Sequence, residues 1–431
     1  MKEFYKNRGN FLMSELIGAC LIGQSGGPTA VINSSAYGVI KTALGKKCIT
    51  KVLAAQHGIR GILDDNIIDM GKEDAETLEL MLTTPASLIR SCRYKLKDFR
   101  EDDTDYKRIL EIFKKYDIRY FFYNGGNDSM DTCNKISEYM ATQDYECRII
   151  GVPKTIDNDL VGTDHCPGFG SSAKYIALSV AEVIKDVHVY DRDAIVVIEV
   201  MGRHAGWLAG AAALSKICCE GPAFVYLPEV PFDMDQFFKD LDEFHRHHKR
   251  IVLVFSEGIK DKHGKFISEY GINDLNIIDE FGHSQLGGLA ATMSNIIRAK
   301  TGSKVRGIEL SLLQRCASHA GSKTDRDEAA MAGAFAVEAA VSGETGKMVG
   351  FRRDTKYGIY KCTPILVDLK DVANAEKVVP REWINEEGNN VTDEFIEYVV
   401  PLIQGELETP YEHGMPKYAR LKRVPAEPVN E

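Results

Sequence analysis

The stretch Gly151-Val-Pro-Lys-Thr-Ile-Asp-Asn-Asp159 places several reactive side chains directly after a short apolar segment. Residues 147–153 have the apolar pattern of a buried strand, which a glycine and a proline bring to an end. Ligands of open α/β sheets bind at the carboxyl ends of the strands, where the polar residues begin. An isolated Asp-Asn-Asp triplet is more often a solvated turn, so the functional interpretation depends on other motifs in the chain.

The overall composition suits a soluble globular protein. The chain has 431 residues, of which 44% are hydrophobic and 27% are charged, and this length predicts two or three domains. The formal net charge of -10 argues against nucleic acid or an anionic membrane surface as the main partner. An anionic small substrate would therefore need basic groups placed locally.

The cysteines and the apolar segments indicate a reduced, cytoplasmic location. The 10 cysteines include no Cys-x-x-Cys pair, so neither a disulfide framework nor a zinc site is expected. The apolar run 12–22 contains Glu15 and continues into a glycine turn, which favours a first strand over a signal peptide. No apolar run approaches the roughly 20 residues that a bilayer span requires, so no membrane partner is expected.

Strand-like and helix-like segments alternate along the chain, which predicts an α/β fold with mainly parallel sheets. The first series has expected strands at 17–22, 50–55, 119–123 and 148–152 and expected helices at 28–44, 105–116, 129–140 and 171–187. The rhythm restarts with strands at 194–200, 223–227, 251–255 and 305–310 and helices at 204–217 and 233–247. Two lobes are therefore expected, and no low-complexity linker separates them.

Two glycine-rich turns of the first series join the stretch at 151–159. Gly26 and Gly27 follow the first strand, and Gly125-Gly-Asn-Asp-Ser129 follows the third. Free backbone N–H groups and the helix dipole at such turns bind anions. A lone glycine pair is more often an ordinary turn, but two such turns and the polar stretch would converge on one sheet edge.

The second series carries polar residues at corresponding places. Met201-Gly-Arg203 and Glu257 each follow a strand, and Arg315 follows the strand at 305–310. A single arginine is more often a surface ion pair, whereas several at strand ends indicate an anion pocket. The segment 168–173 fits a dinucleotide-binding pattern but follows no strand, so nicotinamide cofactor binding has little support.

In their order and spacing, these motifs resemble those of the phosphofructokinase family. The resemblance extends from about Ile17 to the region of Gly350 and is specific because the motifs are many and collinear. It implies two Rossmann-like lobes with the active site between them. It also implies transfer of a phosphoryl group to the 1-hydroxyl of fructose 6-phosphate.

Two positions indicate the phosphoryl donor. ATP-using members usually carry Gly-Gly-Asp-Gly and Pro-Gly-Thr-Ile-Asp, whereas here Asp128 replaces the last glycine of the turn and Lys154 the glycine before Thr155. This chain thus resembles the pyrophosphate-dependent branch. An aspartate side chain fills the space of an α-phosphate and repels it, while Lys154 can pair with the terminal phosphate of pyrophosphate.

The resemblance also implies residue roles. Asp157 is expected to take the proton of the sugar hydroxyl, with Thr155 and Lys154 as the other catalytic residues, and Asp128 and Asp159 are expected to hold Mg²⁺. The implied donor-binding residues are Gly26, Gly27, Arg93, Asp128, Ser129 and Lys154. The implied sugar-binding residues are Thr155, Met201, Gly202, Arg203, Glu257, Arg306 and Arg315.

The same resemblance divides the chain and predicts its assembly. The donor lobe is expected at residues 14–170 and about 314–360, and the sugar lobe at 171–313 and about 361–405. The segment 406–431, rich in proline and charge, is expected to be loosely attached. In the family the residue matching Arg306 reaches into the neighbouring subunit's site, so a homodimer or homotetramer is implied.

Departures from the family pattern leave alternatives open. Asn127 stands where many members have a metal-binding aspartate, and Leu312 stands where ATP-using members often have a histidine. Ala194 replaces a common intersubunit arginine, with Arg192 two residues away, so sedoheptulose 7-phosphate is an alternative acceptor. The alternatives for the whole chain are an ATP-dependent phosphofructokinase, an NAD or lipid kinase, and a non-catalytic regulatory subunit.

Overall fold

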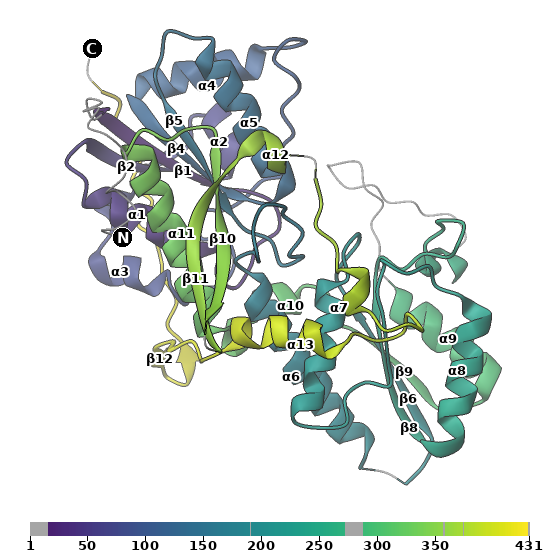
Figure 1. The fold of residues 1–431 in the computed structure, drawn as a ribbon. Helices are drawn as coiled ribbons and strands as arrows, with labels where there is room; N and C mark the ends of the chain where they lie inside the picture. Colours follow the sequence, from purple (N-terminus) through teal and green to yellow (C-terminus); the bar gives the residue numbers. More distant parts are fainter. Residues whose placement is uncertain (1–15, 190, 272–287, 357, 374, 430–431) are drawn as a thin grey trace.

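Two α/β lobes make up the molecule. The computed structural model describes residues 16–189, 191–271, 288–356, 358–373 and 375–429. Each lobe is built on its own sheet, and the two lobes lie at the upper left and the lower right of Figure 1. This arrangement confirms the predicted α/β class with two lobes and mainly parallel sheets.

The larger lobe has a seven-stranded sheet in the order β11-β10-β5-β4-β1-β2-β3. Its parallel strands are β1 (Gly18–Gln24), β2 (Ile49–Ala55), β4 (Ile118–Gly125), β5 (Arg148–Pro153) and β10 (Lys347–Lys356). The antiparallel edge strands are β3 (Ile67–Asp69) and β11 (Ile359–Asp368). The first four parallel strands were all predicted to within a few residues.

Helices cover both faces of this sheet, which explains why its central strands are apolar throughout. In β4, Phe121 and Tyr123 pack toward one layer of helices, whereas Tyr120 and Phe122 pack toward the other. The first layer contains α2 (Gly58–Leu63), α4 (Thr104–Lys115) and α5 (Asn127–Ala141). The second contains α1 (Ile32–Leu44), α3 (Ala75–Leu80) and α11 (Lys323–Val341).

The smaller lobe has a four-stranded parallel sheet in the order β7-β8-β6-β9. Its strands are β6 (Ala194–Val200), β7 (Phe224–Tyr226), β8 (Arg250–Ser256) and β9 (Val305–Glu309). One face packs on α6 (Phe169–Val187), α7 (Trp207–Ala211) and α13 (Asp393–Val399). The other face packs on α8 (Met234–His247) and α9 (Leu289–Thr301).

Two predicted helices begin later than their sequence patterns suggested. The helix expected from residue 28 begins at Ile32, and the one expected from residue 204 begins at Trp207 and continues from Ala212 as a 3₁₀ helix. In the second case Gly202 has a φ of +134°, a conformation that suits a turn and that a helix cannot contain. Residues 201–206 therefore stay outside the helix.

The predicted domain boundary near residue 360 is wrong. β10 and β11 form a continuous antiparallel hairpin, in which Lys347 pairs with Asp368 and Thr355 pairs with Tyr360. Because β10 is also paired with β5, the whole hairpin through residue 368 belongs to the sheet of the larger lobe. The chain returns to the smaller lobe after α12 (Leu369–Val372).

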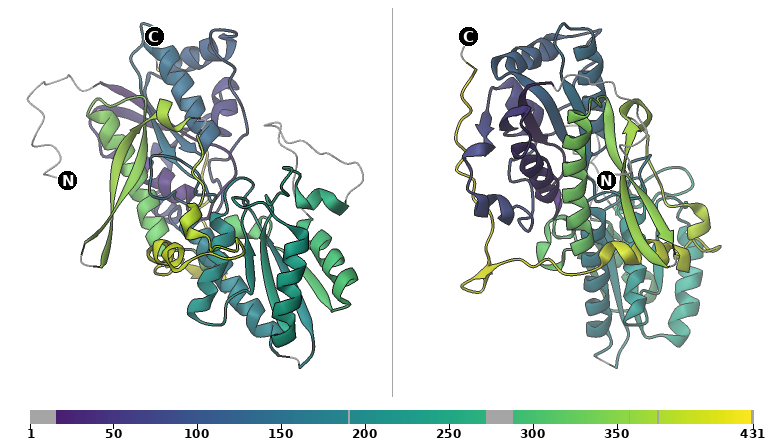
Figure 2. Two further views of the ribbon diagram at one scale, coloured as in Figure 1. Left: turned by 45° about the vertical axis from the view of Figure 1, so that its right-hand side comes forward. Right: turned by 60° about the vertical axis from the view of Figure 1, so that its left-hand side comes forward.

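The C-terminal segment is attached firmly, against the prediction. Residues 417–429, here called the C-terminal strap, run along the larger lobe in the right-hand view of Figure 2. The Asp69 N–H donates to the Val424 carbonyl (2.9 Å), and the Ala426 N–H donates to the Ile67 carbonyl (3.0 Å). The strap thus lies along edge strand β3. Two of its lysines pair with the lobe, Lys417 with Glu76 at 2.5 Å and Lys422 with Asp74 at 2.7 Å.

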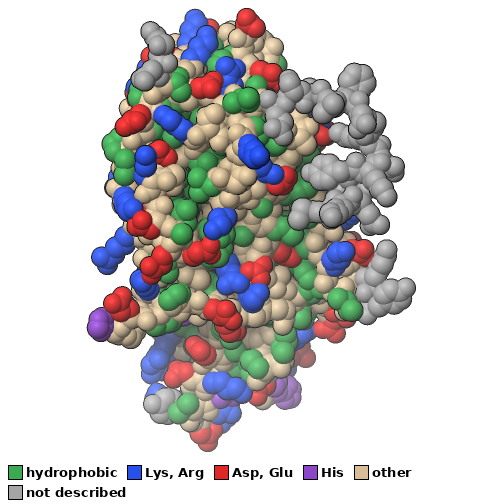
Figure 3. All heavy atoms as spheres, turned by 90° about the vertical axis from the view of Figure 1, so that its left-hand side faces the viewer, with side chains coloured by type: hydrophobic (Ala, Val, Ile, Leu, Met, Phe, Trp, Pro, Cys, Tyr) green, Lys and Arg blue, Asp and Glu red, His purple; other side chains and the backbone are tan. Residues whose placement is uncertain are grey.

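The surface carries charges of both signs. Basic and acidic side chains are interspersed over the face shown in Figure 3, which lies over the larger lobe and its edge. Within the described ranges, every helix is too short or too polar to cross a membrane.

Helix α11 connects the two lobes. Its buried Asp325 accepts hydrogen bonds from the N–H groups of Gly168 (2.8 Å) and Ser171 (2.9 Å), where α6 begins. The amides of the 168–173 motif are therefore already bound, which explains why this sequence does not form a dinucleotide site. Further along, α11 crosses α1 with almost no clearance, since a Cβ on Gly38 would lie 2.1 Å from the Ala330 carbonyl oxygen.

This crossing generates a stability prediction. Gly38→Ala should lower the thermal unfolding midpoint, with a loss of about 1–3 kcal/mol, because the two helix backbones would have to separate. Gly45→Ala is the matched control: Gly45 ends the same helix with a φ of −87°, and its nearest contact to a new Cβ is 3.4 Å. An unchanged midpoint for the Gly38 variant would contradict the backbone contact.

Candidate active site

The carboxyl ends of β1, β4 and β5 bring the predicted donor motifs together. These strands are neighbours in the sheet, and Gly125 pairs with Pro153 at their ends. The Lys154 N–H donates to the Gly125 carbonyl (3.0 Å), and the Lys154 ammonium donates to the Gly27 carbonyl (2.7 Å). The two glycine turns and the 154–159 stretch therefore form one site, as the sequence predicted.

The turn at residues 25–27, here called the donor turn, requires its glycines. Gly26 has a φ of +74°, and a Cβ there would lie 3.3 Å from the Lys154 ammonium. A Cβ on Gly27 would lie 3.0 Å from a guanidinium nitrogen of Arg315. The turn is held by the Ser91 hydroxyl, which donates to the Gly26 carbonyl (2.7 Å). The glycines thus keep space open beside two cations.

Three cations gather around the donor turn. Burial lowers the pKa of Lys154 to about 8; nearby Asp157 and Asp159 oppose this shift, and Arg315 and Arg93 add to it. Burial also lowers the pKa of Arg315, and repulsion from Arg93 adds to that shift. A glycine turn beside buried Lys154 and Arg315, both of which Arg93 repels, forms a pocket that favours a multiply charged anion.

Asp157 has the properties of a proton acceptor. Its N–H donates to the Thr155 hydroxyl (3.0 Å), which fixes the backbone between the two residues. Burial raises the pKa of Asp157, and the carboxylates of Asp159 and Glu257 raise it further. A carboxylate with a raised pKa binds a proton more readily than an exposed one, as general base catalysis requires.

Asp159 and Asn127 present oxygen atoms to the same site. The Asn127 amide donates to one Asp159 carboxylate oxygen (2.9 Å). The other carboxylate oxygen and the Asn127 amide oxygen are buried and accept no hydrogen bond from any described residue. Burial raises the pKa of Asp159. Two buried oxygens without donors are costly unless a ligand binds them, and oxygen ligands are those that Mg²⁺ prefers.

The remaining donor residues lie around the same turns. Asp128 is in the first turn of α5, where its charge complements the helix dipole. Ser129 is buried behind the turn, since a Cβ on Gly125 would lie 2.0 Å from its hydroxyl oxygen. Ser129 therefore fills space beneath the glycine.

The predicted sugar-binding residues meet at the carboxyl ends of β6 and β8. The Gly202 N–H donates to the Glu257 carboxylate (3.3 Å), and the Met201 N–H donates to the Gln314 side chain (3.1 Å). Burial raises the pKa of Glu257, with the Gly202 amide and Arg203 acting in the opposite direction. Glu257 also raises the pKa of Asp157, so carboxylates of the two lobes lie near enough to repel each other.

The two arginines expected at the sugar phosphate lie in different parts of the molecule. Arg315, in α10 (Leu313–Cys316), lies beside Gly27 of the donor turn. Arg306 is exposed on edge strand β9, opposite Val196 near the amino ends of the strands. Within one chain, Arg306 is therefore not assembled with the other site residues.

A segment near residue 377 also reaches the site, and no pattern in the sequence predicted its position. The Lys377 N–H donates to the Asp159 carbonyl (2.7 Å), and Glu376 pairs with His204 at 2.9 Å. The Trp207 indole donates to the Lys377 carbonyl (3.0 Å), so the segment is bonded to both lobes. It has no periodic apolar pattern or known motif that could have placed it here.

The backbone between the carboxylates of Asp157 and Asp159 is held by Asn158. Its φ is +54°, in the left-handed region that asparagine tolerates better than most residues. The side-chain oxygen accepts from the Cys166 N–H (2.9 Å), and the amide donates to the Tyr398 hydroxyl (2.9 Å). The direction of both carboxylates therefore depends on contacts outside the motif.

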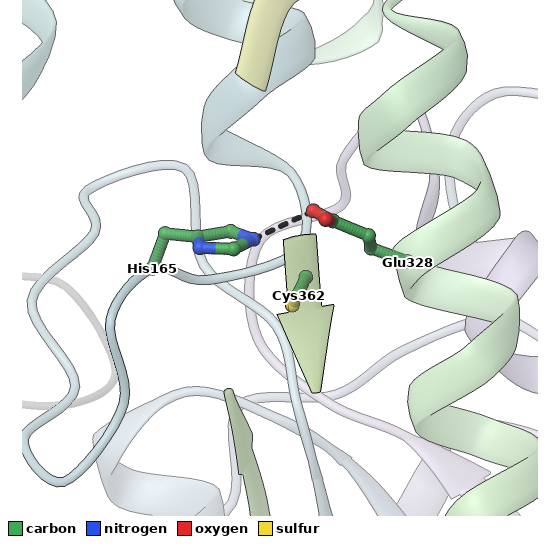
Figure 4. Close-up of side chains that lie close together, drawn as sticks. All are labelled: His165, Glu328 and Cys362. Carbon is green, nitrogen blue, oxygen red and sulfur yellow. Dashed lines mark hydrogen bonds and ion pairs between the residues drawn. The ribbon is translucent and has the colours of Figure 1, made fainter. Parts of the chain in front are cut away.

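His165, Glu328 and Cys362 form a buried cluster behind this loop (Figure 4). Their potential ligand atoms lie within 4.8 Å of one another. However, one ring nitrogen of His165 contacts Glu328 at 2.7 Å and the other contacts Asp164 at 2.8 Å. Because both nitrogens are engaged by carboxylates, the cluster is a buried ion network and not a metal site.

This network predicts a pH-dependent stability. Burial alone would lower the pKa of His165, but the bonds to Asp164 and Glu328 outweigh it and raise the pKa above 6.5. The imidazolium therefore contributes stability at acidic and neutral pH, and that contribution is lost as the pH rises through the raised pKa. Glu328→Gln should cost about 3 kcal/mol where His165 is charged.

Thermal unfolding between pH 6 and 9 tests this expectation, with the deficit of the variant shrinking toward the alkaline end. Glu338→Gln is the control, since Glu338 lies on the same helix in a partly exposed pair with Lys46. An exposed pair contributes about 0–1 kcal/mol. A deficit that is equal at all pH values would exclude a charged His165.

The sequence is similar to phosphofructokinases over most of its length. The family model of phosphofructokinase matches residues 19–340. The sequence is 44% identical over 405 residues to a pyrophosphate–fructose 6-phosphate 1-phosphotransferase of Halomonas elongata, covering 93% of this chain and 95% of that relative. A relative of the same name from Methylococcus capsulatus is 42% identical over 405 residues, with coverage of 93% and 95%.

The fold shows the same similarity. The crystal structure of a pyrophosphate-dependent phosphofructokinase from Nitrosospira multiformis aligns with a TM-score of 0.85 at 39% sequence identity. That alignment covers 96% of this chain and 98% of the other. The similarity therefore includes both lobes and the C-terminal segments that connect them.

Proposed function

Since this chain belongs to the phosphofructokinase family, we propose that it transfers a phosphoryl group from pyrophosphate to the 1-hydroxyl of fructose 6-phosphate. The products are fructose 1,6-bisphosphate and phosphate, and the reaction is readily reversible. The observation that carries the donor assignment is the buried Lys154, whose ammonium is bonded to the Gly27 carbonyl of the donor turn. ATP-using family members are expected to have glycine at this position.

Asp157 acts as the general base. Its carboxylate takes the proton of the sugar 1-hydroxyl as that oxygen attacks the nearer phosphorus of pyrophosphate, and phosphate leaves. The Thr155 hydroxyl holds the Asp157 N–H at 3.0 Å and so sets the start of the loop. The low polarity that raises the pKa of Asp157 also strengthens its contact with a substrate hydroxyl.

The donor turn and its cations bind pyrophosphate. The amides near Gly26 and Gly27 contact phosphate oxygens, and Lys154, Arg315 and Arg93 balance the charge that develops as the bond breaks. We propose that Arg315, which was expected at the sugar phosphate, lies on the donor side, because its guanidinium borders Gly27. Asp128 and Lys154 together disfavour a nucleotide at this turn.

The smaller lobe binds the sugar. Met201, Gly202, Arg203 and Glu257 form the hydroxyl-binding surface, which their mutual hydrogen bonds support. Arg306 serves the sugar phosphate of a neighbouring subunit in a homodimer or homotetramer. Its exposed position on edge strand β9 supports that role, since a partner can reach it there.

Mg²⁺ fits the oxygen atoms left without donors. Asp159 and Asn127 would hold the ion, with Asp128 available nearby, because their buried oxygens match the ligands that this cation prefers. When bound, Mg²⁺ neutralises negative charge on the phosphate oxygens. Asn127 thereby substitutes for the aspartate that many family members carry.

For the location we propose the cytoplasm, which the 10 free cysteines support.

A substitution of the base tests the mechanism. Asp157→Asn should lower kcat by about 10²–10⁴-fold with little change in pyrophosphate affinity, because the fold and the cations remain while the proton acceptor is lost. Asp64→Asn is the control, since Asp64 is 54% exposed in a surface pair with Arg60. Retained turnover in the Asp157 variant would assign the proton transfer to another group.

Donor choice is tested by parallel initial rates with pyrophosphate and ATP at saturating fructose 6-phosphate and Mg²⁺. We expect activity with pyrophosphate alone. Lys154→Met should then reduce kcat/KM for pyrophosphate by about 10–100-fold, the effect of one lost bond to a charged group, and leave the KM for fructose 6-phosphate unchanged. Activity with ATP alone would refute the donor assignment, and inactivity with both would favour a regulatory subunit.

A further inference from the structure

We propose that Arg423 of the C-terminal strap is a positioning residue for the donor turn and thereby tunes pyrophosphate binding. This inference rests on the proposed function. Arg423 touches no reacting atom; it acts through residues 88–92, here called the donor clasp, which contact the donor turn directly.

Arg423 is fixed on both its backbone and its side chain. Its N–H donates to the Glu73 carboxylate (3.1 Å), and its φ of +57° lies in the left-handed region. The guanidinium donates to the Leu88 carbonyl (2.9 Å) and to the Gln56 side chain. Arg423 therefore connects the strap to two segments that lead into the site.

The donor clasp continues this connection to the donor turn. The Ile89 N–H donates to the side chain of Gln24 (3.2 Å), the last residue of β1. The Ser91 hydroxyl donates to the Gly26 carbonyl (2.7 Å), and the Gly26 N–H donates to the Cys92 carbonyl (3.1 Å). The clasp thus binds Gly26 on both its N–H and its carbonyl group.

The second contact of Arg423, with Gln56, also leads to the donor clasp. The N–H of His57, the residue after Gln56, donates to the Ile89 carbonyl (3.3 Å), and the His57 ring contacts the Arg90 guanidinium (3.2 Å). The two contacts of Arg423 therefore hold the clasp from both directions. Arg93, one of the three donor-site cations, directly follows the clasp in the chain.

The clasp depends on such contacts because it has no regular secondary structure of its own. Residues 84–98 form neither helix nor strand, so hydrogen bonds to neighbouring segments, from both backbone and side chains, determine their course. A small displacement of groups that bind a substrate changes affinity strongly. Loss of Arg423 should therefore weaken binding at the donor turn while the sugar-binding lobe is unaffected.

Steady-state kinetics of Arg423→Met test the proposal, with each substrate varied while the other saturates. We expect the KM for pyrophosphate to rise at least about threefold and the KM for fructose 6-phosphate to stay within experimental error of the wild type. Lys422→Met is the matched control: its ammonium contacts Asp74 (2.7 Å) and the Lys72 carbonyl, away from the clasp. Both KM values of this control should be unchanged.

Arg423→Lys provides a second variant that conserves charge. Lysine lacks the two-pronged geometry, so an intermediate KM for pyrophosphate is expected. Calorimetric titration of each folded variant with pyrophosphate and Mg²⁺ should show the same ranking of affinities. If Arg423→Met does not fold, the lysine variant alone decides the question.

Several outcomes would overturn the inference. An unchanged KM for pyrophosphate, equal increases for both substrates, or the same increase in the Lys422 control would each show that Arg423 does not position the donor turn. If the wild-type enzyme is active with pyrophosphate, these outcomes refute only the role of Arg423 and leave the proposed function intact. A wild-type enzyme that is inactive with pyrophosphate would overturn the proposed function and this inference together.

Discussion

The buried ammonium of Lys154 is the charge around which the site is organised. Its bond to the Gly27 carbonyl joins β5 to the turn after β1, and it lies beside Gly26, whose φ of +74° disfavours a side chain. Keeping a lysine charged in a buried position requires compensation, which Asp157 and Asp159 supply in part. Under the proposed function, the phosphate oxygens of pyrophosphate would complete this compensation, which links substrate binding to the electrostatics of the free enzyme.

Much of this site could be predicted because parallel strands place consecutive motifs at one edge. The end of β5 follows from its apolar run and its proline, and the two glycine turns follow from the same βαβ rhythm. Local sequence also identified Asp157 and Lys154, since carboxylates and a lysine directly after a buried strand are unusual. Their raised and lowered pKa values come from burial, which only the assembled fold reveals.

The features that escaped prediction are held by contacts that are distant in sequence. Glu376 and Lys377 lie in a segment without periodicity, and their position depends on backbone bonds to Asp159 and Trp207. The C-terminal strap has a composition typical of loose tails, yet its charges and backbone groups have partners on the larger lobe. Composition indicates how often similar segments are disordered. It does not show whether the folded lobe offers hydrogen-bond and charge partners to this particular segment.

The contact between α1 and α11 has a mechanical consequence. α11 is bonded through Asp325 to the start of α6 in the smaller lobe, while its middle touches the backbone of α1 in the larger lobe. Because α1 begins shortly after the donor turn, the start of α6 in the smaller lobe is connected to the neighbourhood of that turn through one helix and one backbone contact. A side chain that widened the glycine crossing would therefore separate α11 from α1 close to the donor turn.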